Sequence, residues 1–177
     1  MANQTGDSGS FEELAMPLFA RLYNFACWLT RDRTAAEDLV QETFMKALKG
    51  FSSFKQGTNF RAWIYRILRN AFLTSQAGLQ ASISLDAEDD ASLEPATEEN
   101  PETVFLARLE SESIQSALAE LPVNFREIIL LCDFEEMSYQ EISLAIGIPI
   151  GTVMSRLSRA RKAMRTLLAA KLQGASR

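Results

Sequence analysis

Apolar side chains recur every three to four residues through most of this chain, a spacing that places them on one face of an α-helix. The alternation of apolar and polar residues that is typical of β-strands is almost absent. The pattern therefore predicts an all-α protein. The first apolar stripe comprises Phe11, Leu14, Leu18, Leu22, Phe25 and Leu29.

Capping signals divide the rest of the first half into two further helices. Thr34 and Glu37 have the spacing of a capping box, which predicts that a helix begins there and that Gly50 ends it. The next helix is expected to begin near Thr58 or Asn59 and to fade by about residue 78. It would contain the segment FRAWIYRILRNAFL.

The second half contains similar signals. Leu121–Pro122 predicts a break before the apolar helical segment VNFREIILLCDF. Ser138 and Glu141 form another capping-box pattern, and Gly147 is expected to end that short helix. A final helix is predicted from near Ile150 to about residue 172.

The composition changes between these two helical halves. Residues 85–102 are rich in acids and offer few groups to bury, which is typical of a solvated linker. Asn100 and Pro101 then have the pattern of a helix start. We therefore expect two small all-α domains on a flexible tether. The expected parts are a disordered tail at 1–10, an N-terminal domain at 11–80, an acidic linker at 81–101 and a C-terminal domain at 102–174.

The net charge of −5 conceals a segregation of charge along the chain. Residues 43–85 carry six basic residues and no acid, and residues 142–177 carry seven basic residues and no acid. The sixteen acids of residues 86–141 separate these basic blocks. Two cationic surfaces suit a polyanion, because a field of one sign attracts it. The alternative is that both blocks are solvated helix faces.

The last two predicted helices have the arrangement of a helix–turn–helix: YQEISLAI, the turn GIP, and then IGTVMSRLSRARKAMRTLL. On a helical wheel the second helix has an apolar stripe and a separate polar face. The stripe comprises Val153, Leu157, Ala160, Met164 and Leu167. The polar face comprises Thr152, Ser155, Arg156, Arg159 and Lys162, while Arg161 and Arg165 lie toward the back.

That polar face suits the major groove of DNA. Hydroxyl and guanidinium groups can bind base edges there, while further cations bind phosphates. Arg156 and Arg159 are the candidates for reading bases, because arginine can bridge two acceptors of guanine. The alternative is an amphipathic helix whose basic side is only solvated.

The residue inventory argues against enzymatic chemistry. There is no histidine, and Cys27 and Cys132 lack the spacing of a zinc site or disulfide framework. No apolar run is long enough to span a membrane, and the segment MANQTGDSGS lacks the features of an export signal. We therefore expect a cytoplasmic protein that is not an enzyme, with no cofactor, no metal, no small-molecule substrate and no membrane insertion.

The segment from LPVNFREIILL through SYQEISLAIGIPIGTVMSRLSRARKAM resembles the C-terminal domain of extracytoplasmic-function (ECF) sigma factors of bacterial RNA polymerase. The resemblance implies that this domain binds the −35 promoter element. Met154 departs from the family pattern, because a basic residue is common at this position. The implied upstream-element residues are Thr152, Ser155, Arg156, Ser158, Arg159, Arg161 and Lys162.

Two segments of the N-terminal half resemble the same family. AAEDLVQETFMKAL is similar to the helix that docks on the clamp helices of core polymerase, and NFRAWIYRILRNAFL is similar to the promoter-melting segment. Many relatives continue the second segment with a basic run that is absent here. The implied polymerase-binding residues are Asp38, Leu39, Gln41, Glu42 and Phe44. The implied melted-strand residues are Lys55, Asn59, Arg61, Trp63, Tyr65, Arg66 and Arg69.

These observations favour an alternative sigma factor that binds core RNA polymerase and promoter DNA and directs transcription initiation. An anti-sigma factor is an expected further partner. Two alternatives remain: a sigma-like decoy that sequesters an anti-sigma factor, and a stand-alone helix–turn–helix regulator.

On a helical wheel, Tyr65 and Phe72 are expected on the open side of their helix with the arginines, away from its buried stripe.

Overall fold

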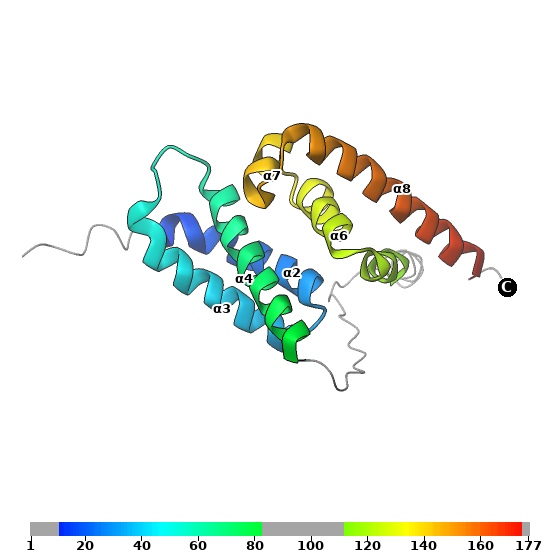
Figure 1. Cartoon of the computed structure of the whole chain (residues 1–177), viewed down its shortest axis with the longest axis horizontal. Coiled ribbons are helices and arrows are strands. Elements are labelled where there is room, and N and C mark those ends of the chain that lie inside the picture. The colour runs from blue at the N-terminus through cyan, green and yellow to red at the C-terminus, as the bar shows by residue number, and fades with distance from the viewer. Residues whose placement is uncertain (1–10, 83–111, 175–177) are drawn as a thin grey trace, which may run out of the picture.

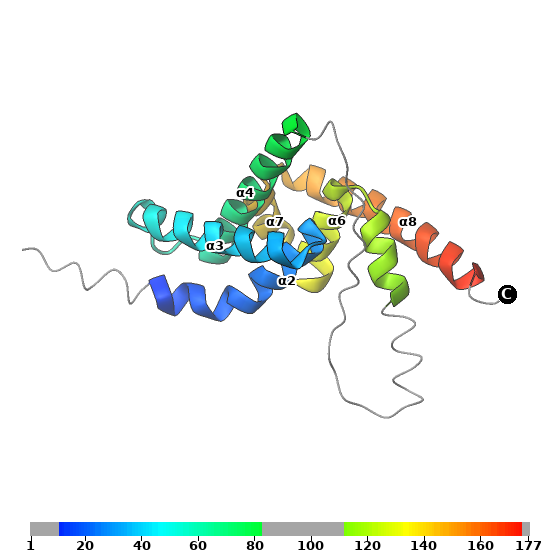
Figure 2. The same ribbon diagram turned by 90° about the horizontal axis from the view of Figure 1, so that it is seen from below.

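The computed structural model describes residues 11–82 and 112–174, and its regular elements are all helical (Figure 1). The all-α prediction is confirmed. The helices of residues 11–82 form one group and those of residues 112–174 form a second, and the two groups pack against each other (Figures 1 and 2). The expected tail, most of the expected linker and the predicted helix start at Asn100 lie outside the described residues.

A short helix at 11–15 leads through the 3-10 turn η1 (Met16–Leu18) into α2 (Phe19–Thr30). Pro17 lies in the first turn of η1, where its missing N–H is tolerated. The 3-10 turn has fewer residues per turn than an α-helix, so it rotates the preceding residues relative to α2. Leu14 is consequently 40% exposed, and its predicted place in the buried stripe is wrong.

Asp32 caps the start of α3 (Arg33–Gly50): its Oδ1 accepts a hydrogen bond from the backbone N–H of Ala35 at 2.7 Å. The predicted Thr34–Glu37 capping box is therefore wrong. Arg31 ends α2 with a left-handed φ of 58°, which leaves Asp32 as the extended residue before α3. The helix ends at the predicted glycine.

The 3-10 turn η2 (Phe51–Ser53) and a loop lead into α4 (Phe60–Ser82). The Asn59 Oδ1 accepts a hydrogen bond from the backbone N–H of Ala62 at 2.9 Å, which confirms the predicted helix start. α4 continues four residues past the predicted end at residue 78, because no proline follows there to stop it. It packs against both α2 and α3.

The second group begins with a helix at 112–120, and the predicted break at Leu121–Pro122 is confirmed. Arg126 stabilises that break from a position that is only 5% exposed. It donates hydrogen bonds to the carbonyl groups of Leu118 and Ala119 at 2.7 and 2.8 Å, which satisfies acceptors at the end of the helix. Burial lowers the pKa of its guanidinium group. The elements after the break are α6 (Val123–Ile129), the π-helical turn η3 (Leu130–Phe134), α7 (Tyr139–Ile146) and α8 (Ile150–Gly174).

The signals around α7 are confirmed. Ser138 Oγ accepts a hydrogen bond from the backbone N–H of Glu141, and the Glu141 carboxylate accepts one from the backbone N–H of Ser138. Gly147 ends α7 with a φ of 70°, a left-handed conformation in which a Cβ atom would be strained. The turn after it directs the chain into α8, so the predicted helix–turn–helix is present.

The two groups of helices meet mainly where α4 packs against α7, with a smaller contact between α2 and α6. α7 lies beside the first turns of α4 in Figure 1. The C-terminal part of α8 runs away from the first group in both views (Figures 1 and 2). One side of α8 is therefore left without a covering element from the first group.

Candidate nucleic-acid interface

α8 presents a polar face because its apolar stripe is buried against α6. Val153, Leu157 and Ala160 are at most 1% exposed, and Met164 and Leu167 pack partly against the same core. The predicted apolar stripe is confirmed. Its burial fixes the rotation of α8 about its axis and thereby decides which side chains face outward.

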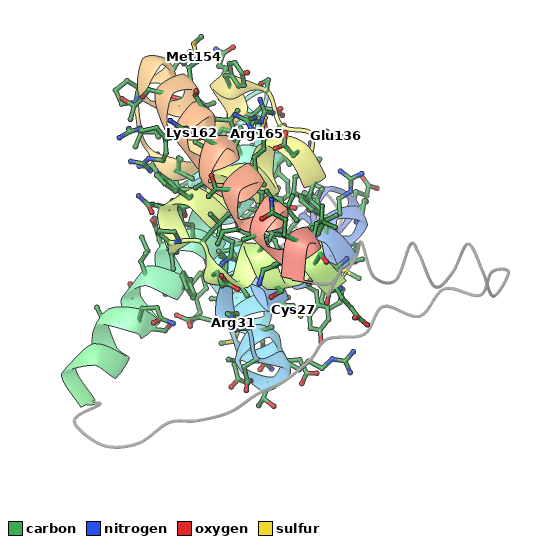
Figure 3. All side chains as sticks on the ribbon, turned by 90° about the vertical axis from the view of Figure 1, so that its right-hand side faces the viewer. Cys27, Arg31, Glu136, Met154, Lys162 and Arg165 are labelled. Atoms are coloured by element: carbon green, nitrogen blue, oxygen red, sulfur yellow. The ribbon has the colours of Figure 1, made fainter. Side chains whose placement is uncertain are left out.

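The outward face of α8 carries hydroxyl groups and cations. Ser155, Ser158, Arg159 and Lys162 are all exposed. The Nε of Arg159 donates a hydrogen bond to the Ser155 carbonyl group at 3.4 Å. Neither Arg159 nor Lys162 forms an ion pair with another residue that the structure describes. Figure 3 shows Lys162 and Arg165 further along the same helix.

Three of the predicted upstream-element residues make contacts at the edges of this face. Thr152 is half-buried. The half-buried Arg156 places its Nη1 4.0 Å from Glu127 Oε1. Arg161 donates a hydrogen bond from Nε to Asp133 at 3.2 Å, and this bond raises the pKa of its guanidinium group.

An apolar edge adjoins the polar face. Met154 is 53% exposed, and Ile150, one turn earlier, is 45% exposed. Met154 lies at the start of α8 in Figure 3, on the same turn as the exposed Ser155. The first turns of α8 therefore carry fewer cations on their outer side than the turns that follow.

The predicted melted-strand residues lie in the loop before α4 and along its first turns. Lys55 and Arg66 are exposed. Trp63 is half-buried, with its ring 5.0 Å from that of Phe54 and 5.5 Å from that of Phe60. The packing of Trp63 against two core aromatic rings leaves it little freedom to stack on a base.

Tyr65 and Phe72 differ from their expected placement. Both were expected on the open side of α4, yet Tyr65 is 1% exposed and Phe72 is 2% exposed, so that expectation is wrong. The Tyr65 ring packs 5.3 Å from that of Phe25 in α2. Burial and the neighbouring Glu135 carboxylate raise the pKa of its hydroxyl group. No base can reach Tyr65 while the helices hold this arrangement.

Arg69 bridges the two groups of helices. Its Nε and Nη2 donate hydrogen bonds to the two carboxylate oxygens of Glu127 at 2.8 and 3.1 Å. Glu127 is only 1% exposed and the Arg69 side chain is 19% exposed, so this is a partly buried, two-pronged ion pair. Arg69 comes from the predicted melted-strand surface, whereas Glu127 comes from α6.

Two more carboxylates of the second group contact the start of α4. Arg61 Nη2 donates to the Glu135 backbone carbonyl group and lies 3.4 Å from its carboxylate. The Asn59 side chain donates to the Glu141 carboxylate at 2.8 Å, and this bond is the chief cause of the lowered pKa of Glu141. The sequence placed these glutamates in an acidic block, but nothing in their local spacing indicated their distant partners.

The third predicted surface lies on α3. Asp38, Gln41 and Glu42 are exposed on one side of the helix, and Glu42 forms an ion pair with Lys46 at 2.6 Å. The expected contact of Leu39 with polymerase stays a prediction, but Leu39 is only 5% exposed and belongs to the core. The physical reason is that α2 and α4 cover this side of α3.

Exposed apolar residues of α3 lie further along the helix. Met45 is 53% exposed and Leu48 is 55% exposed, while Phe44 is half-buried with its ring 5.5 Å from that of Phe19. Met45 was missed by the sequence analysis. The sequence could have indicated Met45, because this methionine lies three residues after Glu42 on a predicted surface helix.

No helix in the two described ranges combines the length and apolar character that crossing a membrane requires.

Comparison with protein families finds two matches. Residues 14–79 match sigma-70 region 2, and residues 111–164 match sigma-70 region 4. The chain is also 35% identical over 144 residues to the ECF RNA polymerase sigma factor EcfG of Rhodopseudomonas palustris, with 81% of this chain and 77% of that protein covered. The chain belongs to the ECF sigma factors.

A second ECF relative is the sigma factor SigE of Mycolicibacterium smegmatis, which is 36% identical over 169 residues. The match covers 93% of this chain, and the chain spans 65% of the length of that relative. The match to region 2 contains α3 and most of α4, and the match to region 4 contains α6, α7 and the first half of α8.

Two solved structures have the same fold. The sigma factor RpoE of Bartonella quintana, in complex with the anti-sigma factor NepR, is 32% identical with a TM-score of 0.75. The match covers 90% of this ECF chain and 97% of that one. CnrH in complex with the cytosolic domain of CnrY is 26% identical with a TM-score of 0.68, and the match covers 94% and 92% of the two chains.

Proposed function

We propose that this chain directs promoter-specific initiation as an alternative sigma factor, with three separate surfaces for polymerase, melted strand and upstream duplex. It supplies recognition and no chemistry of its own, so nucleotide addition belongs to the polymerase. Its place of action is the cytoplasm, where core polymerase and promoter DNA are found. The observation that carries the proposal is the outward face of α8, where Arg159 and Lys162 stand free of carboxylate partners among the described residues.

The upstream duplex is bound by the helix–turn–helix. A major groove admits one α-helix, and the buried stripe of α8 orients Ser155 and Arg159 away from the protein. Arg159 reads guanine, since its planar group can donate to two acceptors of that base. Ser155, Ser158 and Lys162 hold bases or phosphates beside it. Arg161 contributes less, because Asp133 already neutralises its charge.

The melted strand is held by the loop before α4 and by the first turns of that helix. Lys55 and Arg66 are exposed cations for the backbone of a single strand. Asn59, Arg61 and Arg69 join them in the initiation complex, after they leave their carboxylate partners. Trp63 packs against the rings of Phe54 and Phe60, and this packing holds the loop in position for the surface.

Polymerase binds the exposed side of α3. Asp38, Gln41 and Glu42 share one helical face, because residues three and four positions apart are neighbours on a helix. Met45 and Leu48 add apolar contact area next to these polar groups. Such a mixture of exposed apolar residues beside polar ones is typical of a protein interface.

Two domains on one tether make the second DNA contact effectively intramolecular. Two weak sites then combine into a tight one where the promoter spacing fits the tether. An anti-sigma factor is a further partner of this chain, because the similar sigma factor RpoE was solved in complex with the anti-sigma factor NepR. Such a partner would restrict access to the same surfaces.

The test is reconstituted transcription. The purified chain is mixed with core polymerase and a library of promoter templates, and run-off transcripts are sequenced. Gln41→Ala with Glu42→Ala is expected to weaken core binding by about tenfold or more, because both side chains lie on the proposed docking face. DNA binding by the free protein should be unchanged by this pair of substitutions.

Gln140→Ala with Glu112→Ala is the matched control, because these residues are exposed in the second domain, away from α3. Equal core binding by both double variants would favour a stand-alone regulator. Core binding without a transcript from any template would favour a decoy that sequesters an anti-sigma factor.

A further inference from the structure

One outer edge of α8 is apolar over its first two turns. Ile150 is 45% exposed and Met154 is 53% exposed, and residues four positions apart are neighbours on a helix surface. Arg161 lies on the same side two turns after Met154, but its hydrogen bond to Asp133 holds it there. This apolar edge therefore differs from the polar face beside it, which carries exposed cations.

Met154 shares the outward side of α8 with the residues proposed to meet DNA. At about 100° per residue, it lies about 40° from Ser158 and about 60° from Gly151 around the helix axis, and both of these residues are exposed. A Cβ atom added at Gly151 would meet nothing within 4 Å, so the outer side of the first turn is open. Figure 3 shows Met154 at the start of α8, ahead of Lys162. The apolar edge can therefore enter a groove together with the polar face.

The start of a recognition helix is the part that reaches base edges. In helix–turn–helix proteins the N-terminal residues of the second helix contact bases in the major groove, while the first helix crosses the backbone. α8 begins at Ile150, so Met154 lies in its second turn. Met154 is therefore placed to contact a base.

The chemistry of a methionine side chain selects among the bases. Methionine cannot donate a hydrogen bond to the N7 and O6 acceptors of guanine, and its sulfur is only a weak acceptor for the amino group of cytosine. Thymine presents a C5-methyl group in the major groove, and the unbranched thioether can adapt its shape to pack on that group. Thymine is therefore the base that this side chain favours.

We propose that Met154 reads the C5-methyl group of a thymine in the upstream element, within about two base pairs of the base bound by Arg159. The spacing follows because five residues of α-helix rise about 7.5 Å and stacked base pairs lie about 3.4 Å apart. The inference rests on the proposed function, since that function places the outward face of α8 in the major groove. Ile150 extends the apolar contact toward the end of the helix.

The contact also determines how binding depends on salt. Each phosphate that a lysine neutralises releases counterions and makes the slope of log affinity against log salt about 0.9 steeper, whereas an apolar contact releases none. A lysine at position 154 would replace base preference by attraction to the backbone. Met154→Lys therefore gives a second measurement that is independent of the loss of a side chain.

The experiment uses the full chain bound to core polymerase. The holoenzyme first selects its preferred upstream duplex from a randomised library. Each thymine of the selected duplex is then replaced in turn by deoxyuridine, which lacks only the C5-methyl group, and the affinity for each duplex is measured by competition. Met154→Ala is compared with Met16→Ala, the matched control, because Met16 is a methionine of the first group of helices that is 59% exposed.

The unmodified chain and the Met16→Ala variant are expected to lose about three- to fourfold in affinity when one particular thymine loses its methyl group, because burial of one such group contributes about that much. Met154→Ala should bind the two duplexes equally. Met154→Lys should also bind both equally, and its salt slope should be steeper by about 0.9.

Three results would overturn the proposal and leave the proposed function intact. The first is a Met154→Ala variant that keeps the sensitivity to deoxyuridine; if that variant also binds core polymerase more weakly, the apolar edge is a polymerase contact instead. The second is an unmodified chain that is insensitive to deoxyuridine at every position. The third is a selected duplex without thymine within about two base pairs of the base whose preference is lost in Arg159→Ala. If the holoenzyme selects no upstream sequence at all, the proposed function fails, and this inference fails with it.

Discussion

Arg159 shows how one side chain acquires a role from its surroundings. It lies on the exposed side of α8, where its Nε donates a hydrogen bond to the Ser155 carbonyl group at 3.4 Å. Arg161, two residues later, faces Asp133 and is held there. Two arginines of one helix thus differ in availability because the helix turns by about 100° per residue.

Replacement of Arg159 by alanine tests its base-reading role. We expect Arg159→Ala to reduce upstream-element binding by about 1–3 kcal/mol and to relax the preference at one base pair, because a two-pronged contact to guanine would be lost. Binding to a duplex library followed by sequencing measures both effects. Arg165→Ala is the control, since that exposed cation lies further along α8. Uniform weakening across all sequences by Arg159→Ala would identify a phosphate contact instead.

The start of α7 contributes both to local helix capping and to packing against the first domain. Its capping box with Ser138 satisfies the backbone groups of its first turn, and the same Glu141 carboxylate accepts a hydrogen bond from Asn59 of the first domain. Local helix stability and domain packing therefore depend on one ionised group. Gly147 then ends the helix in a conformation that favours glycine, which sets the path into α8.

The double role of Glu141 predicts a pH dependence. Its pKa is lowered first by the hydrogen bond from Asn59 and then by the backbone N–H of Ser138. A carboxylate with a depressed folded pKa contributes stability above its unfolded value of about 4.3, and that contribution is lost as the pH falls through the folded pKa. We expect Glu141→Gln to flatten the acid side of the curve of unfolding free energy against pH.

Urea denaturation across a series of acidic to neutral buffers measures this curve. Glu136→Gln is the control, because Glu136 is an exposed carboxylate in the turn that precedes α7. An equally steep acid decline in the Glu141→Gln variant and in the unmodified chain would contradict the prediction. The control variant should retain the full decline.

At the scale of the whole molecule, the chain combines two groups of helices that contact each other. α4 and α7 are neighbours, and acidic side chains of one group meet basic ones of the other. In the proposed function, the two groups bind separate promoter elements. The segment that joins them sets the effective concentration of the second domain.

Lengthening that segment gives a prediction at this scale. Doubling the connection between residues 82 and 112 with Gly and Ser should weaken promoter binding by the holoenzyme only about threefold, because each doubling of a loop costs about 0.6 kcal/mol. Filter binding with a promoter of fixed spacing measures the change. An insertion of the same length after residue 174 is the control. A loss far greater than threefold would mean that the native linker residues themselves contact polymerase or DNA.

Much of the fold could be predicted because its signals are local. The Ser138–Glu141 box, the end at Gly147 and the start at Asn59 each depend on residues within four positions of one another, and all three are confirmed. The apolar stripe predicted for α8 is confirmed for the same reason, since the stripe depends on residue spacing within one helix and decides the orientation of that helix. The domain boundaries and the DNA roles of individual residues stay predictions.

The wrong expectations share a different cause. Tyr65 and Phe72 were assigned to an open face, although both are buried in the folded chain. Thr34 does not cap α3. Arg31 adopts a left-handed conformation two residues before the start of α3, and Asp32 caps the helix instead. Periodicity reports that a helix has a buried side, but it does not report how many neighbours the helix has.

The sequence by itself determined that this protein is helical, where most of its helices begin and end, and that its charges lie in separate blocks, because those properties depend on neighbouring residues. Only the tertiary structure decided that Glu127 binds Arg69 across 58 positions of the chain and that α7 covers the start of α4. The physical reason is that an ion pair between domains depends on distance in space, and no local pattern of residues encodes that distance.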